Sequence, residues 1–194
     1  ANMPVFPGDS KPSLKQVGFI GEDDCCSFRV ETGMHVGTHM DAPSHMIEGA
    51  KGLAEYPPEH FIGRGVLIDA RGQKSIDVDL LKETPSLENA IVLIFTGLDE
   101  NFEENSYYKN YPELTEAFAE ELVRQKVKIV GMDTPSPDRA PYLIHKILLK
   151  EDVLIIENLC NLKALLPHKE FKVSALPTKF DAEAAPVRVV AEVW

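Results

Sequence analysis

The sequence predicts an α/β domain with a mixed β-sheet. Short apolar runs rich in β-branched residues predict strands, and they outnumber the helical patterns. One strongly amphipathic helical pattern, over 113–126, lies between two of these runs, which is the order expected when helices cover a sheet. The chain has 194 residues, enough to bury one core without disulfides, so we expect a single domain over 1–194.

The first part of the chain predicts an extended segment followed by strands and one short helix. Residues 1–13 contain three prolines and a Gly-Asp turn signal, which predict the extended segment. Residues 25–36 alternate in part between apolar and polar side chains, and 64–70 form an apolar run between two glycines, so both predict strands. We expect a short helix over 76–83, with Asp77 near its start.

The second part contains the clearest patterns. Residues 90–96 form the most apolar run and predict a central strand that is buried on both faces. In the pattern over 113–126, apolar residues recur at helical spacing and charged residues fill the opposite face. The remaining expected elements are strands over 127–133, 152–159, 171–176 and 187–194, and a helix over 142–149.

Composition restricts the partners and the compartment. There are 31 acidic and 20 basic residues, a formal net charge of −11, which repels phosphate groups, so we expect neither nucleic acid nor a membrane as partner. No apolar run approaches the ~18 residues of a membrane span. Cys25, Cys26 and Cys160 do not form a disulfide or zinc-ribbon pattern, and we expect a cytoplasmic protein.

The stretch HVGTHMDAPSH, residues 35–45, carries the strongest functional signal. It places His35, His39, Asp41 and His45 close together, while Gly37 and Pro43 oppose a regular helix and favour a strand that ends in a compact loop. Imidazole and carboxylate groups suit Zn²⁺ or Mn²⁺, and three protein ligands leave positions open for water and substrate. The alternative is a chance cluster of surface histidines beside a turn.

Two more residues are candidates for the same site. Glu157 lies in the apolar run VLIIENL, where a carboxylate is unfavourable unless it is paired or bound to a metal. A salt bridge to Lys or Arg and a metal bond both satisfy that requirement. His145 lies in the helix expected over 142–149, either as a further ligand or as an ordinary surface residue.

The pattern H-x-G-T-H-x-D-x-P-x-H resembles the signature of the cyclase family of metal-dependent hydrolases, which includes bacterial kynurenine formamidase (arylformamidase) and isatin hydrolase. The resemblance continues in order along the chain. The further matching segments are PVFPGD at 4–9, GMDTPSPD at 131–138, HKILL at 145–149, ENL at 157–159 and AAPVRVVA at 184–191.

The resemblance implies a swivelling β/β/α fold, a homodimer or larger homo-oligomer, and one or two divalent ions, Zn²⁺ or Mn²⁺. Residues that match metal ligands of the family are His35, His39, Asp41, His145 and Glu157, the last two allowing a second ion. His45 matches the histidine that handles protons. Many members carry a tryptophan where this chain has Leu98, which predicts a less aromatic pocket.

The ligand set implies a hydrolase for a small substrate. A metal-activated water would attack the amide carbonyl of a small formamide or lactam, and His45 would relay a proton to the departing nitrogen. Two alternatives remain open: a true cyclase, in which the metal stabilises an enolate, and a metal-binding protein without catalysis.

Overall fold

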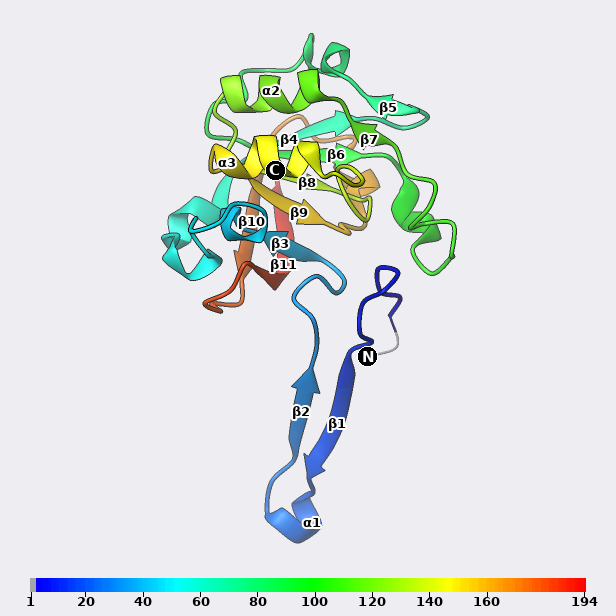
Figure 1. The fold of residues 1–194 in the computed structure, drawn as a ribbon, viewed down its shortest axis with the longest axis vertical. Helices are drawn as coiled ribbons and strands as arrows, with labels where there is room; N and C mark the ends of the chain where they lie inside the picture. The colour runs from blue at the N-terminus through cyan, green and yellow to red at the C-terminus, as the bar shows by residue number, and fades with distance from the viewer. Residues whose placement is uncertain (1–2) are drawn as a thin grey trace.

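Seven strands form a closed barrel in the computed structural model, which describes residues 3–194 (Figure 1). In spatial order the strands are β10 (Phe171–Pro177), β11 (Ala184–Val193), β3 (His39–Asp41), β9 (Leu154–Glu157), β8 (Ile129–Met132), β6 (Ile91–Phe95) and β4 (Ile62–Asp69). Strands β4, β6, β8 and β9 run parallel, and the other pairs are antiparallel. The mixed α/β class is confirmed, and the sheet closes on itself.

Two apolar cores lie on opposite sides of the barrel wall. The inner core collects side chains from all seven strands, whereas the outer core joins β4, β6, β8 and β9 to the helices α2 (Glu116–Arg124) and α3 (Leu143–Lys150). On β6, Leu93 points into the barrel, and Val92 and Ile94 point toward the helices. Burial on both faces explains why this strand is apolar at every position.

Two expected elements are corrected by the structure. The helix expected over 76–83 is wrong: Ser75–Ile76 form β5, and only the 3₁₀ turn Val78–Leu81 follows. The helix expected over 113–126 begins late, because Glu113–Leu114 form β7, parallel to β5. Thr115 caps α2 by accepting a hydrogen bond from the Phe118 N–H, which explains where the helix starts.

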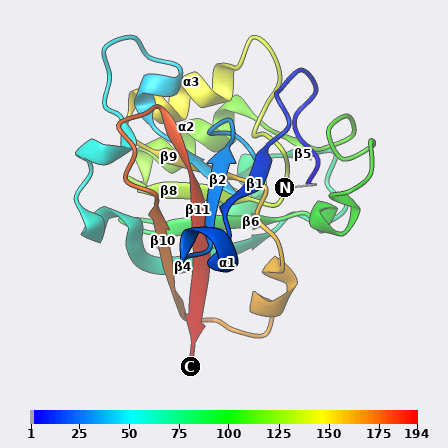
Figure 2. The same ribbon diagram turned by 90° about the horizontal axis from the view of Figure 1, so that it is seen from below.

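A two-stranded arm projects away from the barrel (Figures 1 and 2). It consists of β1 (Ser13–Gly18) and β2 (Ser27–Glu31), with the four-residue helix α1 (Ile20–Asp23) at its tip. The strand expected over 25–36 is therefore shorter, and residues 32–38 form a loop instead. Residues 3–12 contain a turn and no helix or strand, and residues 1 and 2 of the expected extended segment lie outside the described part.

The two faces of the arm differ in character. The strand register places Leu14 opposite Val30, with Phe28 on the same face, and Lys15 opposite Arg29 on the other face. Of these three apolar residues, Leu14 is 53% exposed, Phe28 is 57% exposed and Val30 is 66% exposed. The arm therefore presents an apolar face that residues 3–194 leave uncovered.

Among the helices in residues 3–194, none has the length and apolar content needed to cross a membrane.

Candidate metal centre

The pairing of β3 with β9 brings the side chains of His39, Asp41 and Glu157 together. His39 and Asp41 project from the same face of β3 because side chains alternate along a strand, and Met40 between them enters the inner core. The antiparallel register places His39 directly opposite Glu157 on β9. His39 Nε2 lies 3.3 Å from Glu157 Oε2 and 3.5 Å from Asp41 Oδ1.

Helix α3 supplies a second histidine to the same point. Its buried face includes Ile144, His145 and Leu148, and it packs over β9. His145 Nε2 consequently lies 3.3 Å from Glu157 Oε1 and 3.9 Å from Asp41 Oδ2. A third histidine, His35, comes from the loop before β3, and its Nδ1 lies 3.1 Å from Asp41 Oδ1.

The structure thus places the five expected ligands in one cluster, and it contradicts the alternative readings of two of them. His145 is only 3% exposed, so it is not an ordinary surface residue. Within residues 3–194, the ion-pair partners of Glu157 are His39 and His145, and neither Lys nor Arg is among them. The salt bridge considered for Glu157 is therefore wrong.

The donor atoms fit a divalent cation. Asp41 is 1% exposed, yet neither of its carboxylate oxygens makes a hydrogen bond with residues 3–194, and neither does His39 Nε2. Buried polar atoms without partners are rare because their desolvation is costly, and a cation would satisfy all three. Asp41 belongs to two candidate ligand sets, which are His35–Asp41–His45 and His39–Asp41–Glu157.

The mutual charges of the cluster shift its protonation. Burial by itself lowers the pKa of His39 and His145, but the neighbouring carboxylates outweigh burial and raise these pKa values to about 9 and about 10. Burial opposes ionisation of Asp41 too, but the adjacent histidines lower its pKa to about 2. In the metal-free protein at neutral pH, protons therefore occupy the ring nitrogens that a cation would need.

The rings of His39 and His145 are each held by a hydrogen bond at Nδ1, the nitrogen that faces away from Asp41 and Glu157. His39 Nδ1 lies 2.8 Å from the carbonyl oxygen of Gly37, and His145 Nδ1 lies 2.6 Å from Asp138 Oδ1. A carbonyl and a carboxylate oxygen can only accept, so each Nδ1 donates its proton. Both rings therefore present Nε2 to Asp41 and Glu157.

His45 stands at the edge of the cluster, at the end of the 3₁₀ turn Pro43–His45. Its ring centroid lies 4.3 Å from that of His35 and 5.9 Å from that of His145. Burial lowers its pKa, which keeps the ring neutral at neutral pH. Its ring also belongs to one candidate ligand set with Asp41, so the geometry accommodates either a proton carrier or a ligand.

A cavity of about 230 Å³ opens onto the cluster. Its lining includes His35, Asp41, His45, His145 and Glu157, together with the aromatic residues Phe6, Tyr108 and Tyr142. Leu98 is not among the lining residues. The aromatic rings of this pocket therefore come from other parts of the chain than position 98.

Sequence reasoning missed the residues that support the cluster. Asn158 donates from Nδ2 to the Gly37 carbonyl, its own carbonyl accepts from the Thr38 hydroxyl, and its Oδ1 accepts from the Tyr107 hydroxyl. These bonds fasten the loop that carries His35 to the end of β9. The segments HVGTH and ENL contain Gly37, Thr38 and Asn158, so the sequence identified these positions but not their partners.

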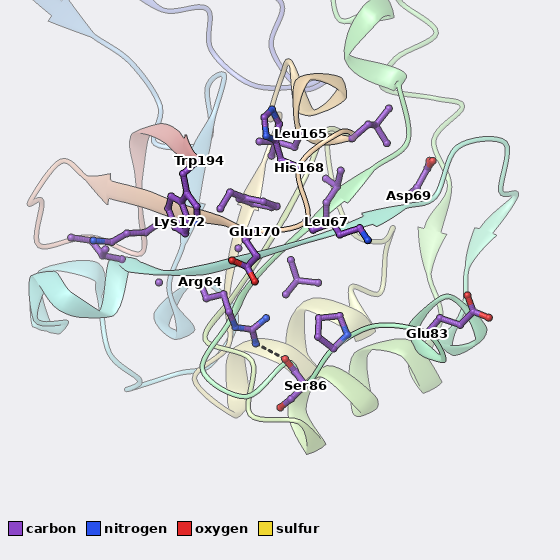
Figure 3. A pocket seen from close by; sticks show the side chains of 18 residues that line it. Arg64, Leu67, Asp69, Glu83, Ser86, Leu165, His168, Glu170, Lys172 and Trp194 are labelled. Atoms are coloured by element: carbon purple, nitrogen blue, oxygen red, sulfur yellow. Dashed lines mark hydrogen bonds between the residues drawn. The ribbon is translucent and has the colours of Figure 1, made fainter.

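A larger cavity, about 1200 Å³, lies along β4 and β10 near Trp194 (Figure 3). Its charged residues include Arg64, Glu170 and Lys172, and Arg64 donates a hydrogen bond to the Ser86 carbonyl oxygen. None of its lining residues belongs to either candidate ligand set in the described part of the chain. Size alone does not identify a metal site, and residues of both candidate ligand sets line the smaller cavity instead.

Comparisons with known proteins find relatives along nearly the whole chain. The family model described as "Putative cyclase" matches residues 1–139. A kynurenine formamidase of Erythrobacter litoralis is 28% identical over 193 residues, covering 97% of this chain and 87% of that protein. An uncharacterized protein of Methanocaldococcus jannaschii is 32% identical over 197 residues, covering 98% of this chain and 93% of that protein.

Solved structures show the same fold. One described as a "potential metal-dependent hydrolase with cyclase activity" has a TM-score of 0.80 at 28% identity, covering 97% of this chain and 90% of that one. Isatin hydrolase A from Labrenzia aggregata has a TM-score of 0.84 at 21% identity, covering 100% and 89% of the two chains, which supports the fold alone. With a family model that matches well over half of its residues, the chain belongs to the cyclase family.

Proposed function

We propose that the chain is a metal-dependent hydrolase that cleaves the C–N amide bond of a small formamide or lactam. The observation that carries the proposal is the buried cluster around Asp41, whose oxygens have no hydrogen-bond partner within residues 3–194 and face an aromatic cavity. The relatives named kynurenine formamidase, which this chain matches over nearly its full length, support the reaction class.

Five residues would hold the cation: His35, His39, Asp41, His145 and Glu157. Their nitrogen and oxygen donors suit Zn²⁺ best and Mn²⁺ next. A bound divalent cation supplies an acidified water and polarises the scissile carbonyl. Asp41 lies in both candidate ligand sets, so its carboxylate can serve a second ion.

The remaining lining residues have roles that need no further group. His45 is neutral at neutral pH because burial lowers its pKa, so it can accept a proton and pass it to the departing nitrogen. Phe6, Tyr108 and Tyr142 provide flat apolar surfaces that suit an aryl or other planar substrate. The volume of about 230 Å³ restricts the substrate to a small molecule.

Turnover in ¹⁸O-labelled water tests the reaction class. The Zn²⁺ and Mn²⁺ forms would be assayed with N-formylkynurenine, isatin and simple cyclic imides, and the products analysed by mass spectrometry. Hydrolysis places one ¹⁸O in the carboxylate or formate that is released. Turnover without label indicates the enolate-stabilising cyclase, and cation binding without turnover of any substrate indicates a metal-binding protein.

We also propose a homodimer, supported by the apolar face of the arm. A two-stranded ribbon is marginally stable alone in water, and Phe28 and Val30 are more than half exposed. Light scattering would compare Phe28→Ser/Val30→Ser with the control Lys15→Ser/Arg29→Ser on the polar face. Dissociation of the first variant only supports the proposal, and a monomeric wild type contradicts it.

We also propose a cytoplasmic location. Cys25, Cys26 and Cys160 are all exposed, and none forms a disulfide within the described residues, as expected in a reducing compartment. Fractionation of the cells that naturally make the protein, followed by immunoblotting of each fraction, tests this location. Recovery outside the cytoplasmic fraction contradicts the proposal.

A further inference from the structure

Among the side chains of residues 3–194 outside the ligand cluster, Asp138 is the one that forms a hydrogen bond with a ring nitrogen of a candidate ligand histidine. Its Oδ1 lies 2.6 Å from Nδ1 of His145, and both residues are buried. We propose that Asp138 is a positioning residue of the metal centre: it selects the tautomer of His145 that leaves Nε2 free for the cation. This inference rests on the proposed function. A carboxylate behind a metal-binding histidine fixes both the ring orientation and the position of its proton.

The carboxylate of Asp138 is itself fixed at both oxygens. Oδ1 accepts from His145, and Oδ2 accepts the Ile144 N–H at 2.6 Å. The backbone carbonyl of Asp138 also accepts the Tyr111 hydroxyl at 3.1 Å. The side chain is only 6% exposed, so water has little access to these bonds. The carboxylate cannot rotate away from His145 without losing the bond to Ile144, and the ring of His145 therefore has a rigid support.

A purely structural role is the alternative to be excluded. Ile144 lies in the first turn of α3, where N–H groups lack partners within the helix and an aspartate is a common acceptor. That role uses Oδ2 alone. The bond from Oδ1 to His145 adds nothing to the start of the helix, but it decides which ring nitrogen carries the proton.

The isosteric change Asp138→Asn separates the two roles, because both contacts require an acceptor and asparagine has one acceptor oxygen. If the amide oxygen keeps the Ile144 N–H, the amide NH₂ faces Nδ1 of His145. The ring must then accept there and carry its proton on Nε2, which faces Glu157. In that tautomer Nε2 cannot bind a cation.

Cation affinity and folding stability would be measured separately. Zn²⁺ affinity comes from competition with a chromophoric chelator, and the visible spectrum of the Co²⁺ form reports the coordination. Stability comes from thermal unfolding of the metal-free protein. The matched control is Asp133→Asn, since Asp133 is also buried and accepts N–H groups of Thr96 and Gly97 but contacts none of the site histidines.

We expect Asp138→Asn to lower Zn²⁺ affinity by about 10- to 100-fold, the usual range for a group that supports a metal ligand. It should also change the Co²⁺ spectrum. Asp138→Ala should lose less affinity than Asp138→Asn, because it leaves both tautomers of His145 accessible. Asp133→Asn should lose stability and keep the affinity of its folded fraction.

Equal Zn²⁺ affinity for folded wild type and Asp138→Asn overturns the inference and leaves the proposed function intact. A larger loss in Asp138→Ala than in Asp138→Asn overturns the tautomer argument as well. If Asp138→Asn does not fold, the comparison of Asp138→Ala with wild type decides, and an unchanged affinity there overturns the inference. A wild-type protein that binds no divalent cation overturns both the inference and the proposed function.

Discussion

Binding of Zn²⁺ to the metal-free protein should release about two protons at pH 7 from His39 and His145. Their pKa values of about 9 and about 10 mean that both rings are protonated before the cation binds. Metal ligands must be deprotonated, so each ring gives up one proton on binding. These two rings alone should therefore raise the affinity about 100-fold for each pH unit near neutrality, tenfold for each proton released. His35 adds to this, because burial lowers its pKa but Asp41 outweighs burial and raises it.

Titration calorimetry in buffers of different ionisation enthalpy measures this number directly. The observed binding enthalpy varies linearly with the buffer enthalpy, and the slope is the number of protons released. The control is His145→Asn, which removes one of the two rings and should lower the slope by about one. The difference between the two proteins isolates the proton of His145 from those that other groups release. A slope near zero in the wild type, or the same slope in both proteins, would refute the reasoning.

Four further outcomes are expected. His39→Ala should lose bound metal by elemental analysis, since His39 Nε2 faces both carboxylates, and undiminished metal would remove it from the ligand set. His45→Ala should keep its metal but lose about 10²–10⁴-fold in turnover, the range for general acid–base catalysis; parallel loss of metal and activity would make it a ligand. In excess chelator, thermal stability should be greatest between about pH 4 and pH 6.5. It should fall as pH rises through about 9 and 10, because the raised pKa values of His39 and His145 stabilise the fold only while the rings are protonated, and it should fall in acid as Asp41, with its pKa lowered to about 2, becomes protonated; a flat profile contradicts this. Gly65→Ala should destabilise the barrel by about 1–3 kcal/mol in urea unfolding, because its Cβ would meet the Phe171 ring, with activity per folded molecule unchanged.

The sequence was sufficient for features that depend on local patterns. The continuous apolar run over 90–96 correctly predicted a strand buried on both faces, and Gly37, with φ of 69°, makes the tight turn expected beside His39. The helical spacing of Phe118 and Leu122 located the outer core. In each case the information lies within a few neighbouring residues.

Features that depend on distant pairing were not predictable. Closure of the barrel requires β11 to pair with β3, and no local pattern in residues 39–41 identifies that neighbour. Glu157 was ambiguous between a salt bridge and a metal, because only the register with β3 shows that His39 lies opposite. The helix expected over 76–83 failed because Ile76 pairs with Leu114 in a strand. Asp138 ends the matched segment GMDTPSPD, but the sequence assigned it no role, since its partner depends on how α3 packs.

The pairing of His39 with Glu157 also sets the order in which the protein can acquire its metal. During synthesis the segment 35–45 leaves the ribosome well before Glu157 is made, because chains emerge from the N-terminus. A cation that meets the nascent chain finds only part of its ligand set, spread over a flexible peptide. The complete five-residue set therefore exists only after β9 has joined the barrel, so the folded protein, and not the growing chain, offers a cation its full coordination.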